Sequence, residues 1–483
     1  MEIYKRSASF LLVYSFKKTF PGGRVYIGHS LERGFYFEPD LKREFTEKDL
    51  AALDAAIKDN IARNIPFTLK EHDFGRAWEL FDANKMKDKL MLMAHIKHRS
   101  VPLYLCDDYF DLYYSPLVPS SGYITSFSLK YYPPGFILQF PNPRMPEKLP
   151  PQHGQKKLFA IYKESKNWSK ILEVYNIGKL NKLIIEDGGS EIIKVAEALH
   201  EKKISNIADI ITERSGNIKL ILISGPSASG KTTFSKRLAI HLRVNGIKTY
   251  PISMDNYFVD RDKTPRDAEG NLDFESIKAV DIELFNRQMK SLLKGETIEV
   301  PDFDFKTGSR RPSGNKLSIG PGEMIIIEGI HGLNKLLCGN IPFKNKYKIY
   351  VSALTQLNID DYNRIPTSYC RILRRIVRDN KFRHYSALDT IKRWPSIRKG
   401  ESRYIFPFQE NANIMFNTAL VYELAVLKKY AEPLLKDIKE DSIDGITATK
   451  LAEFLSFFLK IEDEEVPGTS ILREFIGDSS FHY

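Results

Sequence analysis

The most constraining feature of the sequence is the segment Gly225–Thr232, which reads GPSASGKT. Glycine stands at its first and sixth positions, followed by lysine and threonine, and this is the GxxxxGK[ST] pattern of a phosphate-binding loop. The apolar run ILIS at 221–224 precedes it, and Phe234, Leu238 and Leu242 follow at helical spacing. In such a strand–loop–helix unit, backbone N–H groups and the positive end of the helix point at phosphate oxygens. The sequence therefore predicts a nucleotide phosphate site, and a chance glycine-rich loop is the weaker interpretation.

Each residue of this loop has an expected role toward a nucleotide. The residues expected to surround the phosphates are Gly225, Pro226, Ser227, Ala228, Ser229, Gly230, Lys231, Thr232 and Thr233. Lys231 is expected to reach the β- and γ-phosphates, and the Thr232 hydroxyl to ligate Mg²⁺. ATP and Mg²⁺ are therefore the predicted cofactors. The pattern specifies a nucleotide and not a reaction, so kinases and nucleotide-driven switches both remain open.

Two acidic residues end expected strands of the same domain. Asp255 closely follows the run Lys248–Ser253, and Glu328 follows the run Met324–Ile327. In an open parallel sheet, ligands lie at the carboxyl ends of the strands, so both carboxylates are expected near the phosphate loop. Asp255 suits a base that accepts a proton from an attacking hydroxyl, and Glu328 suits a second partner of Mg²⁺. The alternatives are a helix N-cap for Asp255 and an ordinary strand-end carboxylate for Glu328.

The segment 371–383, RILRRIVRDNKFR, is strongly basic. The arginines that recur in it at spacings of three and four are Arg371, Arg374, Arg375 and Arg378. This spacing places them on one side of a helix, where they repel one another unless an anion is bound. A lid helix that stabilises a transferring phosphoryl group uses arginine in this way. An RNA-binding helix or a solvated basic face would have a similar sequence.

The order of apolar runs and prolines divides the chain. Residues 131–154 contain seven prolines, so we expect neither a regular helix nor a central strand there, but the exit from a first domain. After residue 218, short buried runs alternate with longer segments, which is typical of a parallel α/β sheet. These runs are Lys219–Ser224, Lys248–Ser253, Met324–Ile327 and Tyr347–Val351. The expected divisions are a first domain at 1–150, a helical connector at 151–214, an α/β domain at 215–430 and a helical tail at 431–483.

Composition limits the cellular setting and the partners. The net charge of +11, from 72 basic and 61 acidic residues, favours anionic partners without choosing among them. No apolar run reaches the length of a membrane-spanning helix, and we expect Ser7–Phe16 to be a buried helix and not a secretory signal. The three cysteines, Cys106, Cys338 and Cys370, form neither a disulfide framework nor a zinc pattern. A reducing cytoplasm is the expected location.

The motifs of the α/β domain together resemble those of the uridine kinase and phosphoribulokinase family. The matching segments, in family order, are Asp255, DFESIKAVD at 273–281, PDFDFKTGSR at 301–310, EGI at 328–330 and RRIVRD at 374–379. The resemblance implies a P-loop nucleoside kinase in which Asp255 is the general base for a ribose 5′-hydroxyl. It implies that Glu275 binds the ribose, where the family has aspartate. It also implies catalytic roles for Lys231, Arg375 and Arg378, and substrate contacts by Arg310 and Arg383.

Two positions depart from the family pattern. The tyrosine and histidine that read the base in the family fall on Phe303 and Gly308. Phe303 is therefore expected to line the acceptor site with an apolar surface. A site without these hydrogen-bonding groups cannot strongly reject the wrong base. The resemblance therefore implies phosphoryl transfer, while these two positions leave the identity of the acceptor base open.

The first domain resembles a different family, the additional editing domain of threonyl- and alanyl-tRNA synthetases. The likeness extends over residues 1–145 and includes IGHSLERGFYFE at 27–38. The family's metal-binding and catalytic positions fall on Phe10, Tyr14, Tyr113 and Leu117. None of these side chains supplies an imidazole or a thiolate, so the resemblance implies a domain that has lost both hydrolysis and metal.

The two resemblances, with the tail segment Pro467–Gly477, are similar to a branch of uridine kinase-like proteins that carry a synthetase-like N-terminal half. The expected fold is an α/β P-loop kinase domain preceded by an α+β domain. The expected activity is transfer of the ATP γ-phosphoryl group to a nucleoside acceptor. The alternative is an ATP-binding, RNA-associated or regulatory protein with little kinase activity. Contact with tRNA or RNA through the first domain, and a homo-oligomeric state, are left open by the sequence.

Overall fold

The computed structural model describes residues 1–95, 100–142, 145, 148–149, 154–267, 270–304, 307–439 and 441–482. The chain forms two compact units. Unit 1 comprises Met1–Glu186 together with Leu357–Ile365, and unit 2 comprises Asp187–Gln356 together with Pro366–Tyr483. The chain therefore leaves unit 2 once, contributes nine residues to unit 1, and returns. The division after Glu186 falls inside the segment that the sequence suggested as a helical connector.

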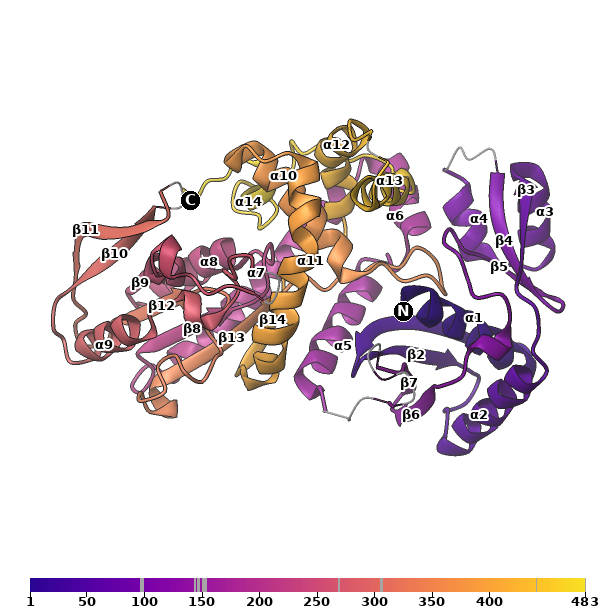
Figure 1. Ribbon diagram of the computed structural model, residues 1–483, viewed down its shortest axis with the longest axis horizontal. Coiled ribbons are helices and arrows are strands. Elements are labelled where there is room, and N and C mark those ends of the chain that lie inside the picture. The colour runs from indigo at the N-terminus through magenta and orange to yellow at the C-terminus, as the bar shows by residue number, and fades with distance from the viewer. Residues whose placement is uncertain are drawn as a thin grey trace. The chain divides into compact units, whose positions relative to one another are not determined.

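The larger sheet of unit 1 is antiparallel, in the order β1-β2-β7-β6. Its strands are β1 (Arg24–Leu31), β2 (Gly34–Asp40), β6 (Ser128–Tyr132) and β7 (Gly135–Gln139). Side chains alternate between its two faces. Phe35 and Phe37 point into a core shared with the helices α1 (Glu2–Thr19) and α2 (Glu47–Ala62). Tyr36 lies on the other face, where its ring meets Phe159 of α5 (Lys156–Ile171) at 5.2 Å. The sheet is thus covered by helices on both faces (Figure 1).

The rest of unit 1 is a small antiparallel sheet, β3-β4-β5, with helices beside it. The elements are β3 (Thr68–Asp73), α3 (Phe74–Ala83), α4 (Lys87–Met93), β4 (Ser100–Cys106), β5 (Tyr109–Leu112) and α6 (Ile177–Asp187). The apolar run Ser7–Phe16 is entirely buried inside α1, as the sequence predicts. Its neighbour α2 begins at a capping box, in which Thr46 and Asp49 satisfy each other's backbone N–H groups.

One expectation for unit 1 is wrong. We expected no central strand within 131–154, yet β7 lies between β2 and β6 in the sheet. Pro133 and Pro134 occupy the turn between β6 and β7, so the strand itself, GFILQ, contains no proline and keeps its full set of backbone donors. Residues 143–144, 146–147 and 150–153 of the same segment lie outside the described residues.

Unit 2 is built on a five-stranded parallel sheet in the order β14-β13-β8-β12-β9. Its strands are β8 (Leu220–Ser224), β9 (Thr249–Ser253), β12 (Met324–Glu328), β13 (Lys346–Ser352) and β14 (Ile414–Asn417). The first four coincide with the apolar runs, which confirms the predicted parallel sheet. The fifth, β14, was not predicted, because its apolar run is too short to stand out. β8 is central, so the loop that follows it opens between two neighbouring strands at their carboxyl ends.

Helices surround this sheet, and one hairpin extends from it (Figure 1). The helices are α7 (Ser190–Thr212), α8 (Lys231–Val244), α9 (Ile282–Leu293), α10 (Thr367–Arg383), α11 (Ala387–Tyr404), α12 (Glu423–Lys436), α13 (Ile443–Ser456) and the short α14 (Arg473–Ile476). The hairpin consists of β10 (Ile298–Asp304) and β11 (Ser309–Leu317). Within the described ranges, no helix combines the length and the apolar character needed to cross a membrane.

Candidate active site

The phosphate loop connects β8 to α8 and requires glycine where it bends. Gly230 has φ +78°, in the left-handed region, and Ala228 also has a positive φ of 58°. A side-chain carbon added at Gly225 would lie 2.0 Å from the carbonyl oxygen of Val351, so this position has no room for any side chain. These bends direct the loop around the N-terminal end of α8, where the N–H groups of the first turn can bind an anion.

The carboxyl ends of three adjacent strands bring the predicted acidic residues to this loop. Glu328 of β12 stands in register with Ser253 of β9 and Ile223 of β8. Ser253 Oγ donates a hydrogen bond to Glu328 Oε1 at 3.1 Å and accepts one from the backbone N–H of Asp255 at 3.3 Å. The Lys231 ammonium donates to the carbonyl oxygen of Pro226 at 3.2 Å, inside the loop. Asp255, Glu328 and Lys231 therefore form one cluster, as the strand-end rule predicts.

The charges of this cluster are incompletely balanced. Burial, followed by the neighbouring charge of Asp255, raises the pKa of Glu328 to about 7. Burial likewise raises the pKa of Asp255, although the positive charges of Lys231, Arg383 and Arg378 oppose the shift. Two half-buried carboxylates next to each other favour an additional cation. The oxygen ligands of Thr232 and Glu328 are the hard donors that Mg²⁺ prefers, so the residues present fit this metal.

The arginine-rich helix α10 serves two purposes. Arg371 and Arg374 are buried, and their guanidinium groups form ion pairs with Glu401 of α11 and Glu423 of α12. Arg371 also donates to the carbonyl oxygen of Ser227 at 3.1 Å. The sequence suggested that clustered arginines need a bound anion, but for these two the protein supplies the carboxylates itself. They hold the phosphate loop and the helices in place.

The other arginines of α10 face the phosphate loop with less compensation. Arg375 donates to Ser227 Oγ at 2.7 Å. Arg375, Arg378 and Arg383 all pair with the single carboxylate of Asp379, at 3.0, 3.0 and 3.5 Å. Three cations on one anion leave net positive charge beside the loop. This is the arrangement needed to bind or stabilise a phosphoryl group.

Two residues expected to contact the acceptor, Glu275 and Arg310, lie in different parts of unit 2. Glu275 packs against Gly400 of α11, and its Oε2 atom is buried without a hydrogen bond within the described structure. Burial, and then the charge of Glu401, raises the pKa of Glu275 to about 7. Arg310 lies on the hairpin and pairs with Asp281 at 2.9 Å. Glu275 is thus positioned toward the cluster, because the charges of Arg375 and Lys231 also act on it, while Arg310 is held by its own partner.

Both positions that depart from the family pattern are buried, so they do not form an exposed surface of the acceptor site. Phe303 is only 8% exposed and packs on Phe258 with ring centres 5.6 Å apart, so it is largely a core residue. Gly308 has φ +73°, and a side-chain carbon there would lie 2.5 Å from Nε of Arg261. Glycine at 308 is therefore required by the turn, and the guanidinium of Arg261 takes the space that a side chain would occupy.

Two residues that contact the phosphate loop escaped sequence reasoning. Thr418, just after β14, donates from Oγ1 to the carbonyl oxygen of Ser229 at 2.7 Å. Glu474 of α14 accepts hydrogen bonds from Thr233, which lies in the first turn of α8 directly after the loop. The short run at 414–416 followed by polar residues could have indicated Thr418 by the same strand-end rule. No local signal marks Glu474.

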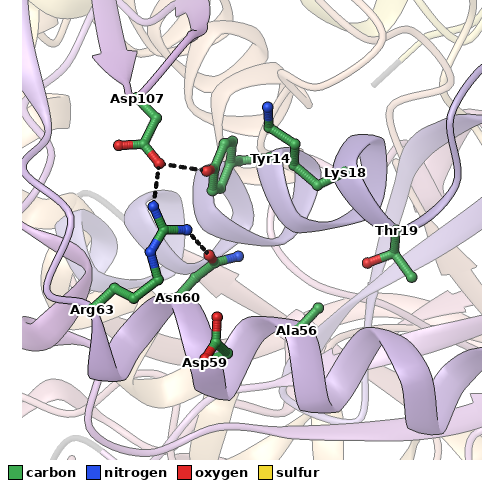
Figure 2. A pocket seen from close by; sticks show the side chains of 8 residues that line it. All are labelled: Tyr14, Lys18, Thr19, Ala56, Asp59, Asn60, Arg63 and Asp107. Carbon is green, nitrogen blue, oxygen red and sulfur yellow. Dashed lines mark hydrogen bonds and ion pairs between the residues drawn. The ribbon is translucent and has the colours of Figure 1, made fainter.

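In unit 1, the four positions of the synthetase-like site lie together but in a packed core. Phe10 meets Tyr113 edge-on at 5.4 Å, and Leu117 and Tyr14 belong to the same buried cluster. Tyr14 also lines a cavity of about 410 Å³, shown in Figure 2, together with Lys18, Thr19, Ala56, Asp59, Asn60, Arg63 and Asp107. The Tyr14 hydroxyl donates to Asp107 at 2.7 Å, and Arg63 pairs with the same carboxylate at 2.8 Å. The polar groups of this cavity are thus largely paired with one another.

Comparison with known proteins agrees with this division of the chain. Residues 220–424 match the model of the Phosphoribulokinase / Uridine kinase family, and unit 2 therefore contains a P-loop kinase domain of that family. The uridine kinase of Ureaplasma parvum serovar 3 is 26% identical over 197 residues, which cover 40% of this chain and 86% of that one. The solved structure of a possible uridine kinase from Bacillus stearothermophilus covers 44% of this chain and all of its own, with 19% identity and a TM-score of 0.30.

The N-terminal part matches a different group. The threonine–tRNA ligase of Lawsonia intracellularis is 31% identical over 129 residues, or 27% of this chain. The chain spans about 20% of the length of that ligase. Both resemblances drawn from the sequence motifs are thereby confirmed, together with the α/β P-loop fold.

Proposed function

We propose that unit 2 transfers the γ-phosphoryl group of ATP to a hydroxyl group of a small nucleoside-like acceptor. The observation that carries the proposal is the cluster of Asp255 and Glu328 beside Lys231 at the end of the sheet. A pure nucleotide-binding module needs the phosphate loop but has no use for a second, poorly neutralised carboxylate. The family match over 220–424 and the similarity to a uridine kinase support the same class of reaction.

The roles follow from the positions of the groups. Lys231 and the loop N–H groups hold the β- and γ-phosphates, while Arg375 and Arg378 offset the charge that develops on the transferring group. Asp255 accepts the acceptor's hydroxyl proton as the hydroxyl oxygen bonds to the γ-phosphorus and the bond to the bridging oxygen of ADP breaks. A raised pKa makes its carboxylate a stronger base near neutral pH. Bound Mg²⁺, held by Thr232 and Glu328, would neutralise phosphate charge.

The acceptor is proposed as a nucleoside whose ribose contacts Glu275. The buried, unpartnered Oε2 atom of Glu275 supports this role, because a hydroxyl of the acceptor can complete its hydrogen bonding. Base selection is proposed to be weak, since Phe303 is mostly core and position 308 carries no side chain. An RNA-associated role of unit 1 is the second proposal, and its support is the match to threonine–tRNA ligases.

The experiment that tests the kinase proposal is Lys231→Ala in the full chain. ATP turnover with a panel of nucleosides should fall by about a hundredfold, because one fixed charge on the phosphates is lost. The unfolding midpoint in urea should be unchanged, since Lys231 forms no core contact. Lys294→Ala, which removes a lysine that is 60% exposed, is the matched control and should retain full activity. Near-normal turnover of Lys231→Ala would refute the assignment.

A further inference from the structure

The C-terminal tail, defined here as residues 463–477, reaches the phosphate loop from the far end of the sequence. Glu474 Oε2 accepts a hydrogen bond from Thr233 Oγ1 at 2.8 Å and a second from the Thr233 backbone N–H at 3.2 Å. Thr233 is the third residue of α8, so its N–H belongs to the first turn, where backbone donors are available to anions. A negatively charged group therefore already stands at the anion-binding end of α8.

The contact is held by packing on both sides of Glu474. Ile471 lies against Gly230: a side-chain carbon added at Gly230 would lie 2.5 Å from the Cγ2 atom of Ile471. The ring of Phe475 lies 4.9 Å from the guanidinium of Arg374, which itself contacts the loop. Both apolar side chains are fully buried. The carboxylate is thus placed at the loop by its neighbours, and not by a chance surface rotamer.

The tail is anchored independently of the loop. Arg473 pairs with Asp463 at 3.0 Å and donates to the carbonyl oxygen of Val466 at 2.8 Å, which closes the tail on itself. Lys381 of α10 donates to the carbonyl oxygen of Ile476. The charge of Glu474 also contributes to raising the pKa of Glu328, which places it near the strand-end cluster. Glu474 is thus a third carboxylate near the two of the cluster, which are already incompletely neutralised.

We propose that Glu474 occupies the position of a nucleotide phosphate on the loop, so that ATP must displace this carboxylate in order to bind. The inference rests on the proposed nucleotide site. The phosphate concerned is the α- or the β-phosphate, because the loop N–H groups at the start of α8 cradle these two groups. A carboxylate and a phosphate cannot share the Thr233 donors, since each is an anion that accepts the same two hydrogen bonds. In the absence of a nucleotide, the tail thus keeps the Thr233 donors occupied by Glu474.

Equilibrium binding of ATP and of adenosine to the full chain tests this, with wild type, Glu474→Gln and Glu465→Gln compared. Glutamine keeps the shape of Glu474 and removes its charge. ATP affinity of Glu474→Gln should rise about tenfold, because hydrogen bonds to a charged acceptor are the strong ones. Adenosine affinity should not change, since adenosine has no phosphate. Glu465→Gln alters a tail carboxylate that is 49% exposed and pairs with Lys194, and it should bind ATP as wild type does.

The outcomes separate this inference from the proposed function. Equal or weaker ATP binding by Glu474→Gln, with wild type binding ATP, would overturn the competition and leave the kinase assignment intact. Absence of ATP binding in both proteins would overturn the nucleotide site and the inference together. Hydrogen exchange of wild-type protein provides a second test that needs no variant. Amides of residues 470–477 should exchange faster when ATP is added, and slower exchange would contradict displacement.

Discussion

Each unit contains a lysine among carboxylates, and the two clusters differ in how completely they are neutralised. In unit 1, Lys89 is fully buried and lies 2.8 Å from Asp111 and 2.7 Å from Asp360. Although burial lowers the pKa of Lys89, the carboxylates of Asp111, Asp360 and Asp88 outweigh it and hold that pKa well above its usual value. In unit 2, Lys231 contacts a carbonyl oxygen, and no ion pair joins it to Asp255 or Glu328 in the described structure.

The difference distinguishes a structural cluster from a functional one. The Lys89 cluster is closed to solvent and joins the segment Leu357–Ile365, which enters from unit 2 along the chain, to the core of unit 1. The Lys231 cluster is half-buried, and no ion pair neutralises its two carboxylates in the described structure, so a bound cation can still complete it. Neighbouring carboxylates without a direct ion pair favour a bound cation and so indicate a candidate ligand site, whereas carboxylates paired directly with a buried lysine indicate a structural role.

The greatest change is expected in enzymatic activity, when a carboxylate of the functional cluster in unit 2 is replaced. Asp255→Asn should lower phosphoryl transfer to every acceptor by about a thousandfold, since a general base is lost. The free energy of unfolding should stay equal or rise, because repulsion with Glu328 is removed. Turnover assays with several nucleosides and urea unfolding measure the two quantities. A variant that is both active and destabilised would reverse the assignment of this cluster.

The opposite result is expected in unit 1. Lys89→Met should reduce the free energy of unfolding by about 3–5 kcal/mol, because Asp111 and Asp360 lose the positive charge that pairs with them in the buried core. Chemical denaturation measures the loss, and the exposed neighbour Lys87→Met should show none. Adding Asp111→Asn to Lys89→Met should recover part of the stability. If the free energy of unfolding of Lys89→Met equals that of wild type, the cluster does not stabilise unit 1.

The smallest effect concerns pH. Because the pKa of Glu328 is raised to about 7, the folded protein retains a proton that the unfolded chain loses near its ordinary value. Stability from this group is therefore complete at acidic pH and is lost as the pH rises through about 7. Glu328→Gln should flatten the decline in unfolding free energy between about pH 5 and pH 8 by on the order of 1–2 kcal/mol.

The pH dependence of the wild-type protein alone cannot reveal the share that belongs to Glu328, because Asp361 of unit 1 also has a raised pKa. Burial, and then the charge of Asp88, raises the pKa of Asp361 to about 7. The informative quantity is the difference in slope between wild type and Glu328→Gln. Identical slopes would mean that Glu328 is not protonated in the folded protein. Saturating ATP and Mg²⁺ should reduce the wild-type slope, because a bound cation favours the carboxylate.

Local sequence patterns account for much of the site. The phosphate loop, the parallel strands of unit 2 and the carboxylates at their ends follow from spacing within short windows, since backbone conformation and strand burial are set by near neighbours. Local patterns gave a wrong prediction at 131–154, because the many prolines of this segment argued against the central strand β7. They also overstated the role of an external ligand for Arg371 and Arg374, because Glu401 and Glu423 are 30 and 49 residues away in the sequence.

Short stretches of sequence were enough to predict the P-loop domain, its resemblance to the uridine kinase and phosphoribulokinase family, the candidate catalytic residues Lys231 and Asp255, and the candidate metal ligand Glu328. The folding of the whole chain settles which charges are already paired. It brought Glu474 to Thr233 across 241 residues and placed Asp360 in the core of unit 1. Motifs encode what a side chain can do, but partners distant in sequence are chosen by the packing of the whole chain, and that choice separates a closed ion pair from a site open to a ligand.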